Sequence, residues 1–306
     1  MKLSHIRNVL AVAEAGSLRA AGRRLGITQP AITRSIRDME KELGLSLFTR
    51  GANGVTLTEM GRIFVRRAVT VESELRRVRE ELEQAQGNFV GQVSVAMGAA
   101  SSIALMPSIL PGFRKAYPKA LIRLSESMFQ AIEQDILSGE IDFYVGPLDV
   151  DLSSTRLVVE RLFDNSRFVV GRKGHPMGHA RTLAELRDAQ WVRPTFSSHD
   201  VEVDFAAMFE RAGLPQPEIA MHARSSLMTL LAVAHSDLLT VLPRQWLEFS
   251  TMADAIQVIH LDEILRAAPV CIVRRGDMPL TPLAERLCDL VRRAGANYQD
   301  RSNRSD

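Results

Sequence analysis

The sequence predicts an α+β protein of several domains: a small helical domain with a β-hairpin, one long helix, and a C-terminal pair of α/β lobes. Residues 17–44 have the apolar spacing of two short helices, and residues 58–87 repeat apolar positions at steps of three and four. After Gly91, short apolar runs alternate with helical patterns. A chain of 306 residues is long enough for two or three such domains.

The first element is a pair of helices joined by a tight turn over residues 17–44. Ser17 can cap the first helix, and Gly26 can adopt the left-handed conformation that ends it. Thr28 can cap the second helix, whose first turn accepts Pro30 because no backbone N–H is needed there. The second helix has an apolar stripe, expected to be buried, that consists of Ile32, Ile36, Met39 and Leu43.

The opposite face of the second helix carries groups that can contact DNA. Amide, hydroxyl and guanidinium groups at a helix N-terminus read base edges and bind phosphates. The candidate DNA-binding residues on this face are Gln29, Pro30, Thr33, Arg34 and Arg37, and the capping residues Ser17 and Thr28 are added to them. Taken alone, the pattern also fits two amphipathic helices in an ordinary helical domain.

A hairpin, or wing, is predicted over residues 47–61, where two short β-prone runs flank Asn53-Gly54. Arg50 lies at its base, as a phosphate or minor-groove contact or as a solvated surface charge. Residues 1–70 hold 12 Lys and Arg against 5 Asp and Glu, a balance of +7, although the whole chain carries only +2. This local positive charge favours binding to phosphates.

A long helix is predicted over residues 58–87, with Thr58 as its cap and Gly87 as its end. Its apolar positions hold a heptad pattern for three heptads, as in coiled coils. At 1.5 Å per residue the helix would span roughly 40 Å. The pattern favours dimerisation with a second copy, and the alternative is packing of this helix on its own domain. The seam consists of Phe64, Ala68, Val71, Leu75, Val78, Leu82 and Ala85.

The C-terminal region reads as parallel βαβ units, with strands expected at 92–97, 121–127 and 141–146 and helices between them. In open α/β sheets, ligands bind beyond the carboxyl ends of the strands. Hydroxyl groups and backbone N–H groups at the following helix starts suit an anion, although each serine pair also fits a plain helix cap. The candidate ligand-binding residues are Ala100, Ser101, Ser102, Met128, Phe129, Pro147, Thr195, Phe196, Ser197, Ser198, His199 and Ser225.

The N-terminal motif resembles one known family. The segment VAEAGSLRAAGRRLGITQPAITRSIRDMEKELGLSLFTR, followed by VTLTEMG, is similar to the winged helix-turn-helix of the LysR-type transcriptional regulators. The resemblance is specific over residues 1 to about 90, and beyond them it rests mostly on element order. A departure lies at residues 235–238, His-Ser-Asp-Leu, where family members often have a Gly-x-Gly step.

The resemblance implies a domain plan. Residues 1–57 would form the DNA-binding domain, 58–87 the dimerisation helix, and 91–306 an effector-binding domain similar to type 2 periplasmic binding proteins. Its lobe I would comprise about 91–162 and 267–296, and its lobe II about 163–266, with crossovers near 159–166 and 265–270. The resemblance also implies homotetramers assembled through the lobes, and usually activation of a nearby divergent gene.

Other chemistry has weaker support in the sequence. Cys271 and Cys288 fit inert core thiols, with a peroxide-sensing disulfide as the alternative. His175 and His179 flank Pro and Gly, which favours a loop over a metal site. We find no convincing catalytic constellation and therefore predict no enzyme, no metal and no cofactor; an enzyme on the two-lobed fold with an accessory DNA-binding domain is the alternative.

The expected partners follow from these features. We expect double-stranded DNA with inverted-repeat half-sites, a homodimer made through the long helix, and RNA polymerase as a further candidate partner. The expected effector is a small organic anion, an aromatic or aliphatic carboxylate or sulfonate. The N-terminal segment has no continuous apolar core or cleavage site, and no run approaches a membrane span, which predicts a cytoplasmic protein.

Overall fold

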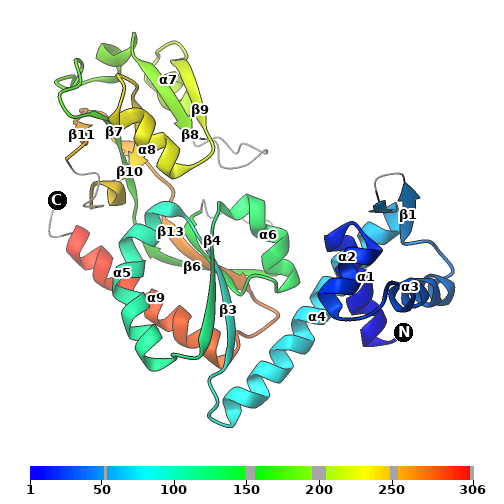
Figure 1. Ribbon diagram of the computed structural model, residues 1–306. Coiled ribbons are helices and arrows are strands. Elements are labelled where there is room, and N and C mark those ends of the chain that lie inside the picture. Colours follow the sequence, from blue (N-terminus) through cyan, green and yellow to red (C-terminus); the bar gives the residue numbers. More distant parts are fainter. Residues whose placement is uncertain (52–53, 149–155, 195–204, 249–253, 304–306) are drawn as a thin grey trace. The chain divides into compact units, whose positions relative to one another are not determined.

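The computed structural model describes residues 1–51, 54–148, 156–194, 205–248 and 254–303. The chain forms two compact units. One comprises Met1–Leu82 with Ser138–Glu140, and the other comprises Glu83–Leu137 with Ile141–Asp306. Figure 1 shows the elements of each unit along the chain.

The N-terminal unit has a three-helix core with a hairpin. Its core is built from one face of each helix, because Ile6, Val12, Ala21, Ile32 and Met39 are all buried in one cluster. Leu43, predicted to be buried, is 37% exposed because it lies in the last turn of its helix, beyond that cluster. The elements are α1 (Leu3–Ala15), α2 (Leu18–Leu25), α3 (Gln29–Leu43), β1 (Phe48–Gly51), β2 (Gly54–Leu57) and the long helix α4 (Glu59–Ala85).

The start of α4 is fixed by a cap and a close approach. The Gly61 N–H donates to Thr58 Oγ1 at 2.9 Å, which confirms Thr58 as the cap. A Cβ on Gly61 would lie 2.0 Å from the backbone oxygen of Leu47, so only glycine fits there. The helix ends at Ala85, two residues before the predicted Gly87.

The predicted seam of α4 divides into two parts. Phe64 and Ala68 pack into the core of the N-terminal domain. Val71, Val78 and Leu82 are 41%, 51% and 62% exposed in the single chain. The first turns of the seam therefore pack within their own domain, whereas the later positions leave an apolar surface uncovered.

Lobe I is a five-stranded mixed sheet in the order β4-β3-β5-β13-β6. The neighbours β4, β3 and β5 are parallel, as predicted, but β13 runs antiparallel to β5 and β6. Helices α5 and α9 pack on one face of the sheet, and α6 packs on the other. The bounds are β3 (Gly91–Met97), α5 (Ala99–Ala116), β4 (Ala120–Glu126), α6 (Phe129–Ser138), β5 (Phe143–Pro147), β6 (Leu157–Phe163), β13 (Val270–Arg275) and α9 (Pro282–Ser302).

Lobe II is built around β7 (Ser166–Arg172), which pairs antiparallel with three strands. Its core contains Trp191, which meets Phe205 and Phe209 edge to face. The segment after Thr182 forms only a short 3-10 turn (Leu183–Leu186). The remaining elements are β8 (Gln190–Pro194), α7 (Phe205–Arg211), β9 (Glu218–Ala223), α8 (Ser226–Ala234), β10 (Thr240–Pro243), a 3-10 turn at Arg244–Glu248, β11 (Ile256–Ile259) and β12 (Leu265–Arg266).

The two cysteines are buried in the core of lobe I, and His175 is hydrogen-bonded within a loop of lobe II. Cys271 and Cys288 are buried, form no disulfide with each other, and pack into clusters on different faces of the lobe I sheet. Burial raises the pKa of the Cys288 thiol to about 12. The His175 ring bonds to the Met177 N–H and to the Asp237 backbone oxygen, both at 3.0 Å, so it braces a loop.

Among the described residues no group of three metal-ligating side chains occurs. Within the same residues, no helix combines the length and the apolar character that crossing a membrane requires.

Candidate functional site

The two capping residues of the helix-turn-helix hold its turn in place. Ser17 Oγ accepts from the Ala20 N–H, and Thr28 Oγ1 accepts from the Ala31 N–H, each at 3.4 Å. Gly26 between the helices has a φ of 68° and ends α2 in the left-handed conformation, as predicted. These contacts fix where α3 begins.

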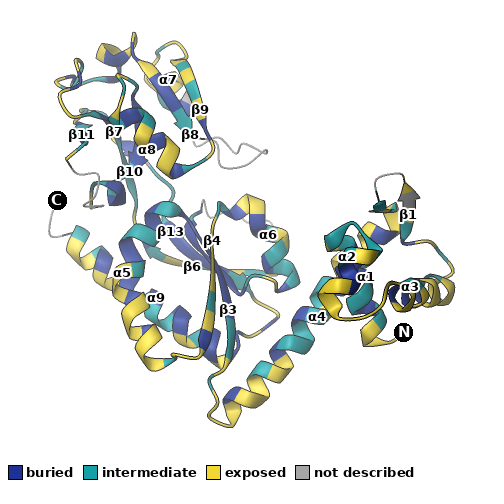
Figure 2. Ribbon diagram, viewed as in Figure 1, coloured by how far each residue is buried: buried dark blue, intermediate teal, exposed yellow. Residues whose placement is uncertain are grey.

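The outer face of α3 is exposed (Figure 2), and most of its side chains are polar or charged. Gln29, Pro30, Arg34 and Arg37 are exposed, while Ile32, Ser35, Ile36 and Met39 face the core. Thr33 is half-buried, and its hydroxyl donates to the Gln29 backbone oxygen at 2.9 Å. Its oxygen keeps acceptor capacity toward a partner.

The hairpin is docked against the turn between α1 and α2. The Val55 N–H donates to the Gly16 backbone oxygen at 3.0 Å. A Cβ on Gly54, whose φ is 124°, would lie 2.6 Å from that same oxygen, which explains the glycine. Arg50 lies in β1 opposite Val55, and Asn53 lies outside the described residues.

Glu40 connects α3 to the hairpin, a role that the sequence did not reveal. Its Oε1 accepts from the N–H groups of Leu47 and Phe48, at 2.8 and 3.2 Å. Charge-assisted bonds of this kind are stronger than neutral ones. The exposed face of α3 and the hairpin therefore form one braced surface.

A second candidate site is a pocket between the two lobes, of about 700 Å³ including space open to solvent. Lobe I contributes the start of α5, Met128 between β4 and α6, and the end of β5, which agrees with the expectation that ligands bind beyond strand ends. Lobe II contributes β7, β10, the start of α8 and Trp246. The lining is Gly98, Ala99, Ala100, Met128, Pro147, Asn165, Arg167, Pro194, Ser226, Thr229, Val241, Leu242, Pro243 and Trp246.

The predicted effector residues divide into those that line this interlobe pocket and those that do not. Ala100, Met128 and Pro147 line it. Ser101, Ser102, Phe129 and Ser225 are not among its lining residues. Thr195, Phe196, Ser197, Ser198 and His199 lie outside the described residues.

The four residues that do not line the pocket have local explanations. Ser101 is fully buried, and its Oγ has no hydrogen-bond partner among the described residues. Ser102 Oγ donates to the Gly98 backbone oxygen at 3.2 Å. Phe129 packs in the core against Tyr144, with ring centroids 5.8 Å apart. Ser225 occupies the N-cap position of α8 without a side-chain capping bond.

Two features of this site were not predicted from the sequence: the bond that Ser226 makes across the lobes, and the residues beside the first crossover. Ser226 Oγ donates to Glu126 Oε1 at 2.5 Å, so the start of α8 in lobe II is bonded to the end of β4 in lobe I. Asn165 lies at the first crossover between the lobes, directly before β7, and Arg167 lies in β7; both line the pocket. Their position beside the crossover was the available signal.

A basic winged helix-turn-helix joined to a two-lobed α/β domain with a pocket between the lobes defines a ligand-responsive DNA-binding regulator. The family description "LysR substrate binding domain" matches residues 86–296, and "Bacterial regulatory helix-turn-helix protein, lysR family" matches residues 3–62. The chain therefore belongs to the LysR family of transcriptional regulators. Members of this family are regulators and not enzymes.

Individual similar proteins are also transcriptional regulators. The HTH-type transcriptional regulator GbpR of Azospirillum brasilense is 26% identical over 298 residues, covering 96% of this chain and 86% of GbpR. TdcA of Escherichia coli (strain K12) is 28% identical over 243 residues, covering 79% and 77%. The crystal structure of CbnR, a LysR family regulator, has a TM-score of 0.72 at 21% identity, covering 96% of this chain and 99% of CbnR. CbnR has also been solved in complex with its target DNA, and the likeness establishes the shared fold.

Proposed function

We propose that α3 reads a specific operator through Gln29, Thr33, Arg34 and Arg37, with Arg50 of the hairpin contacting phosphate or the minor groove. The exposed polar face of α3 carries this proposal, because its buried face is fully used by the domain core. Guanidinium and amide groups are the side chains best suited to base edges in the major groove.

Arg34→Ala tests this proposal. The variant should weaken operator binding by ~1–3 kcal/mol, because a bidentate contact to a base is lost. Lys41→Ala, which removes the same charge from the last turn of α3, is the matched control. Gel-shift titrations against the native promoter and a scrambled competitor supply the measurement. Equal losses in both variants would show that α3 contributes only general charge.

We infer that the active form is a homodimer made through α4, with half-sites arranged as an inverted repeat. The exposed apolar positions Val71, Val78 and Leu82 support this, since burying them requires a partner. A further exposed apolar face on α8 supports assembly of dimers into a homotetramer; it consists of Leu227, Met228 and Leu231. RNA polymerase is the proposed partner in activation.

Leu82→Asp tests the α4 interface. It places an unpaired charge in the seam, so sedimentation should show loss of dimers and operator affinity should fall with it. Gln86→Asp adds the same charge just beyond the helix and should leave both unchanged. A Leu82→Asp protein that keeps its mass and affinity would place the interface elsewhere.

We propose that the effector is a small organic anion, a carboxylate or sulfonate, bound in the interlobe pocket. Arg167 and the backbone at the N-terminus of α5 support an anion, and Val241 and Trp246 support an apolar body. A ligand that contacts both lobes changes the output by favouring one arrangement of them over another.

Ala100→Leu tests the effector site by narrowing the pocket. Effector affinity, followed through Trp246 emission, should fall about tenfold because overpacking costs 1–3 kcal/mol. Ala116→Leu adds the same bulk at the exposed end of α5 and serves as control. If Ala100→Leu responds to effector like the unaltered protein, the ligand does not occupy this pocket.

A further inference from the structure

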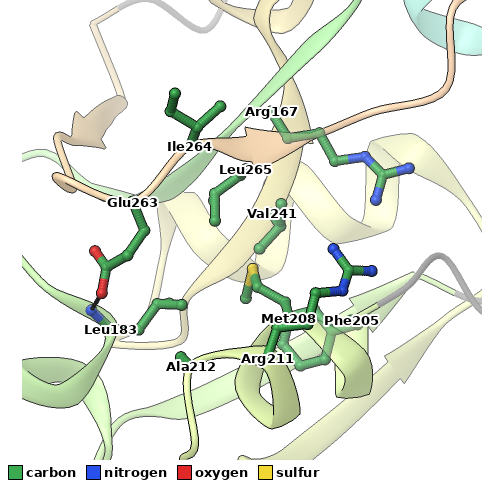
Figure 3. Close-up of a pocket in the computed structure, with 10 residues that line it drawn as sticks. All are labelled: Arg167, Leu183, Phe205, Met208, Arg211, Ala212, Val241, Glu263, Ile264 and Leu265. Carbon is green, nitrogen blue, oxygen red and sulfur yellow. Dashed lines mark hydrogen bonds between the residues drawn. The ribbon is translucent and has the colours of Figure 1, made fainter.

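Lobe II contains a second pocket, of about 720 Å³ including space open to solvent. It lies between α7, the paired strands β7 and β10, and residues 263–265 (Figure 3). We propose that this lobe II pocket binds a second small organic acid, one with a carboxylate at one end, an apolar body, and a hydroxyl or amino group at the other end. The site is distinct from the interlobe pocket proposed above.

The floor of the lobe II pocket is apolar and well packed. Leu183, Phe205, Val241 and Leu265 are 1%, 5%, 7% and 8% exposed and belong to the core of the lobe. Met208 packs against the same core from α7. Such a floor accepts a flat or branched hydrocarbon body of a ligand, and a few polar groups at its edges would fix the orientation.

Two guanidinium groups lie on one side of the pocket, that of Arg167 from β7 and that of Arg211 from α7 (Figure 3). A guanidinium presents five N–H donors in a planar fork, so it can add a ligand carboxylate to contacts it already makes. Two such groups at one edge of an apolar pocket favour an anionic end of the ligand there.

Glu263 lies on the opposite side of the pocket (Figure 3). Its Oε1 accepts from the Leu183 N–H at 2.9 Å, which fixes the carboxylate. Its Oε2 is buried and has no hydrogen-bond partner within the described part of the chain. A buried carboxylate oxygen without a donor is unfavourable, and an O–H or N–H of the ligand would satisfy it.

The two pockets share part of one wall. Arg167 and Val241 line both of them. Arg167 lies in β7 and Val241 in β10, and these two strands pair with Pro243 opposite Arg167. A carboxylate that engages Arg167 from the lobe II pocket changes what the same guanidinium offers to the interlobe pocket. The two ligands should therefore alter each other's affinity by the same factor.

The two tryptophans of the chain allow the pockets to be followed separately. Trp191 meets Phe205, a lining residue of the lobe II pocket, at 5.3 Å between ring centroids, whereas Trp246 lines the interlobe pocket. Full-length protein carrying Trp246→Phe should change its emission on titration with 3-hydroxybenzoate or 3-aminobenzoate. Benzoate, which lacks the donor for Glu263, should bind at least about tenfold more weakly.

Variants then assign the site. Arg211→Gln should weaken all three probes at least about tenfold, and Glu263→Gln should remove the preference for the hydroxyl- or amino-bearing probes. Arg187→Gln, an exposed arginine of the same lobe outside the pocket, should leave the affinities unchanged. No emission change at millimolar probe, or equal affinities in Arg211→Gln and Arg187→Gln, would overturn the proposal.

Ala100→Leu in the same background separates this proposal from the interlobe effector site. It should leave the Trp191 titration unchanged, because Ala100 lines only the interlobe pocket of the two. If Ala100→Leu abolishes the Trp191 response and Arg211→Gln does not, the probes occupy the interlobe pocket. In that case the lobe II site is refuted while the interlobe effector site stands.

Discussion

Gln84→Ala removes a buried hydrogen bond between the end of α4 and the start of α9. Gln84 Oε1 accepts from the Leu283 N–H at 2.9 Å, and the two residues are only 4% and 0% exposed. Next to it, Thr281 Oγ1 accepts from the Ala284 N–H at 3.4 Å. Two backbone N–H groups in the first turn of α9 are thus bonded, one to the local cap Thr281 and one to Gln84 of α4.

The size of the destabilisation expected for Gln84→Ala follows from the loss of the hydrogen-bond acceptor for the Leu283 N–H. A buried N–H left without a partner costs ~1–3 kcal/mol of unfolding free energy. For a unit of this size, each kcal/mol lowers the melting temperature by about 2–4 °C. A loss of about 2 kcal/mol therefore predicts a melting temperature lower by about 4–8 °C.

Scanning calorimetry of the full-length protein measures this change, with Gln86→Ala as control because Gln86 is exposed two residues further on. Gel-shift titrations give a second reading. If the bond also transmits the effector signal, Gln84→Ala should reduce the effector-induced change in operator affinity while leaving the effector-free affinity unchanged. Equal melting temperatures for Gln84→Ala and Gln86→Ala would refute the reasoning.

Three further predictions concern stability and reactivity. Ser226→Ala breaks the bond between the lobes and should lower the unfolding free energy by ~1–3 kcal/mol in urea titrations. Burial raises the pKa of Cys288 from an ordinary value near 9 to about 12, so this thiol should resist thiol reagents at pH 8. Between pH 9 and pH 12 the thiol ionises only in the unfolded protein, and the free energy of unfolding should therefore fall as the pH rises through this range. Gly61→Ala forces a Cβ against the Leu47 oxygen and should lower the melting temperature, whereas Gly112→Ala, with open space around it, should not.

The exposed face of α3 could be predicted from the sequence because its determinants are local. The cap at Thr28, the left-handed Gly26 and the buried positions Ile32 and Met39 lie within one helical pair, and the structure agrees with each. The prediction that Leu43 is buried was wrong, because periodicity alone does not indicate where the core ends. The bracing by Glu40 was missed because its partners belong to the following segment.

The strand directions of lobe I illustrate a second limit. Alternating strands and helices predicted parallel βαβ units, and β3 is parallel to both β4 and β5, because one helix connects β3 to β4 and another connects β4 to β5. The antiparallel strand β13 pairs with residues more than 100 positions earlier in the chain. Pairing over such a separation has no local signature, so the mixed character of the sheet appears only in three dimensions.

The linings of the two pockets were harder to predict than the exposed face of α3. The rule that ligands bind beyond strand ends selected Ala100, Met128 and Pro147, which line the interlobe pocket, because the start of a helix after a strand is set by neighbouring residues. It also selected Ser101, which is fully buried and does not line the pocket, since the rule fixes the segment and not the direction of each side chain. Arg167 was passed over because its only sequence signal was its position beside the crossover between the lobes. Arg167 stands out only in the folded protein, because there it lines both pockets.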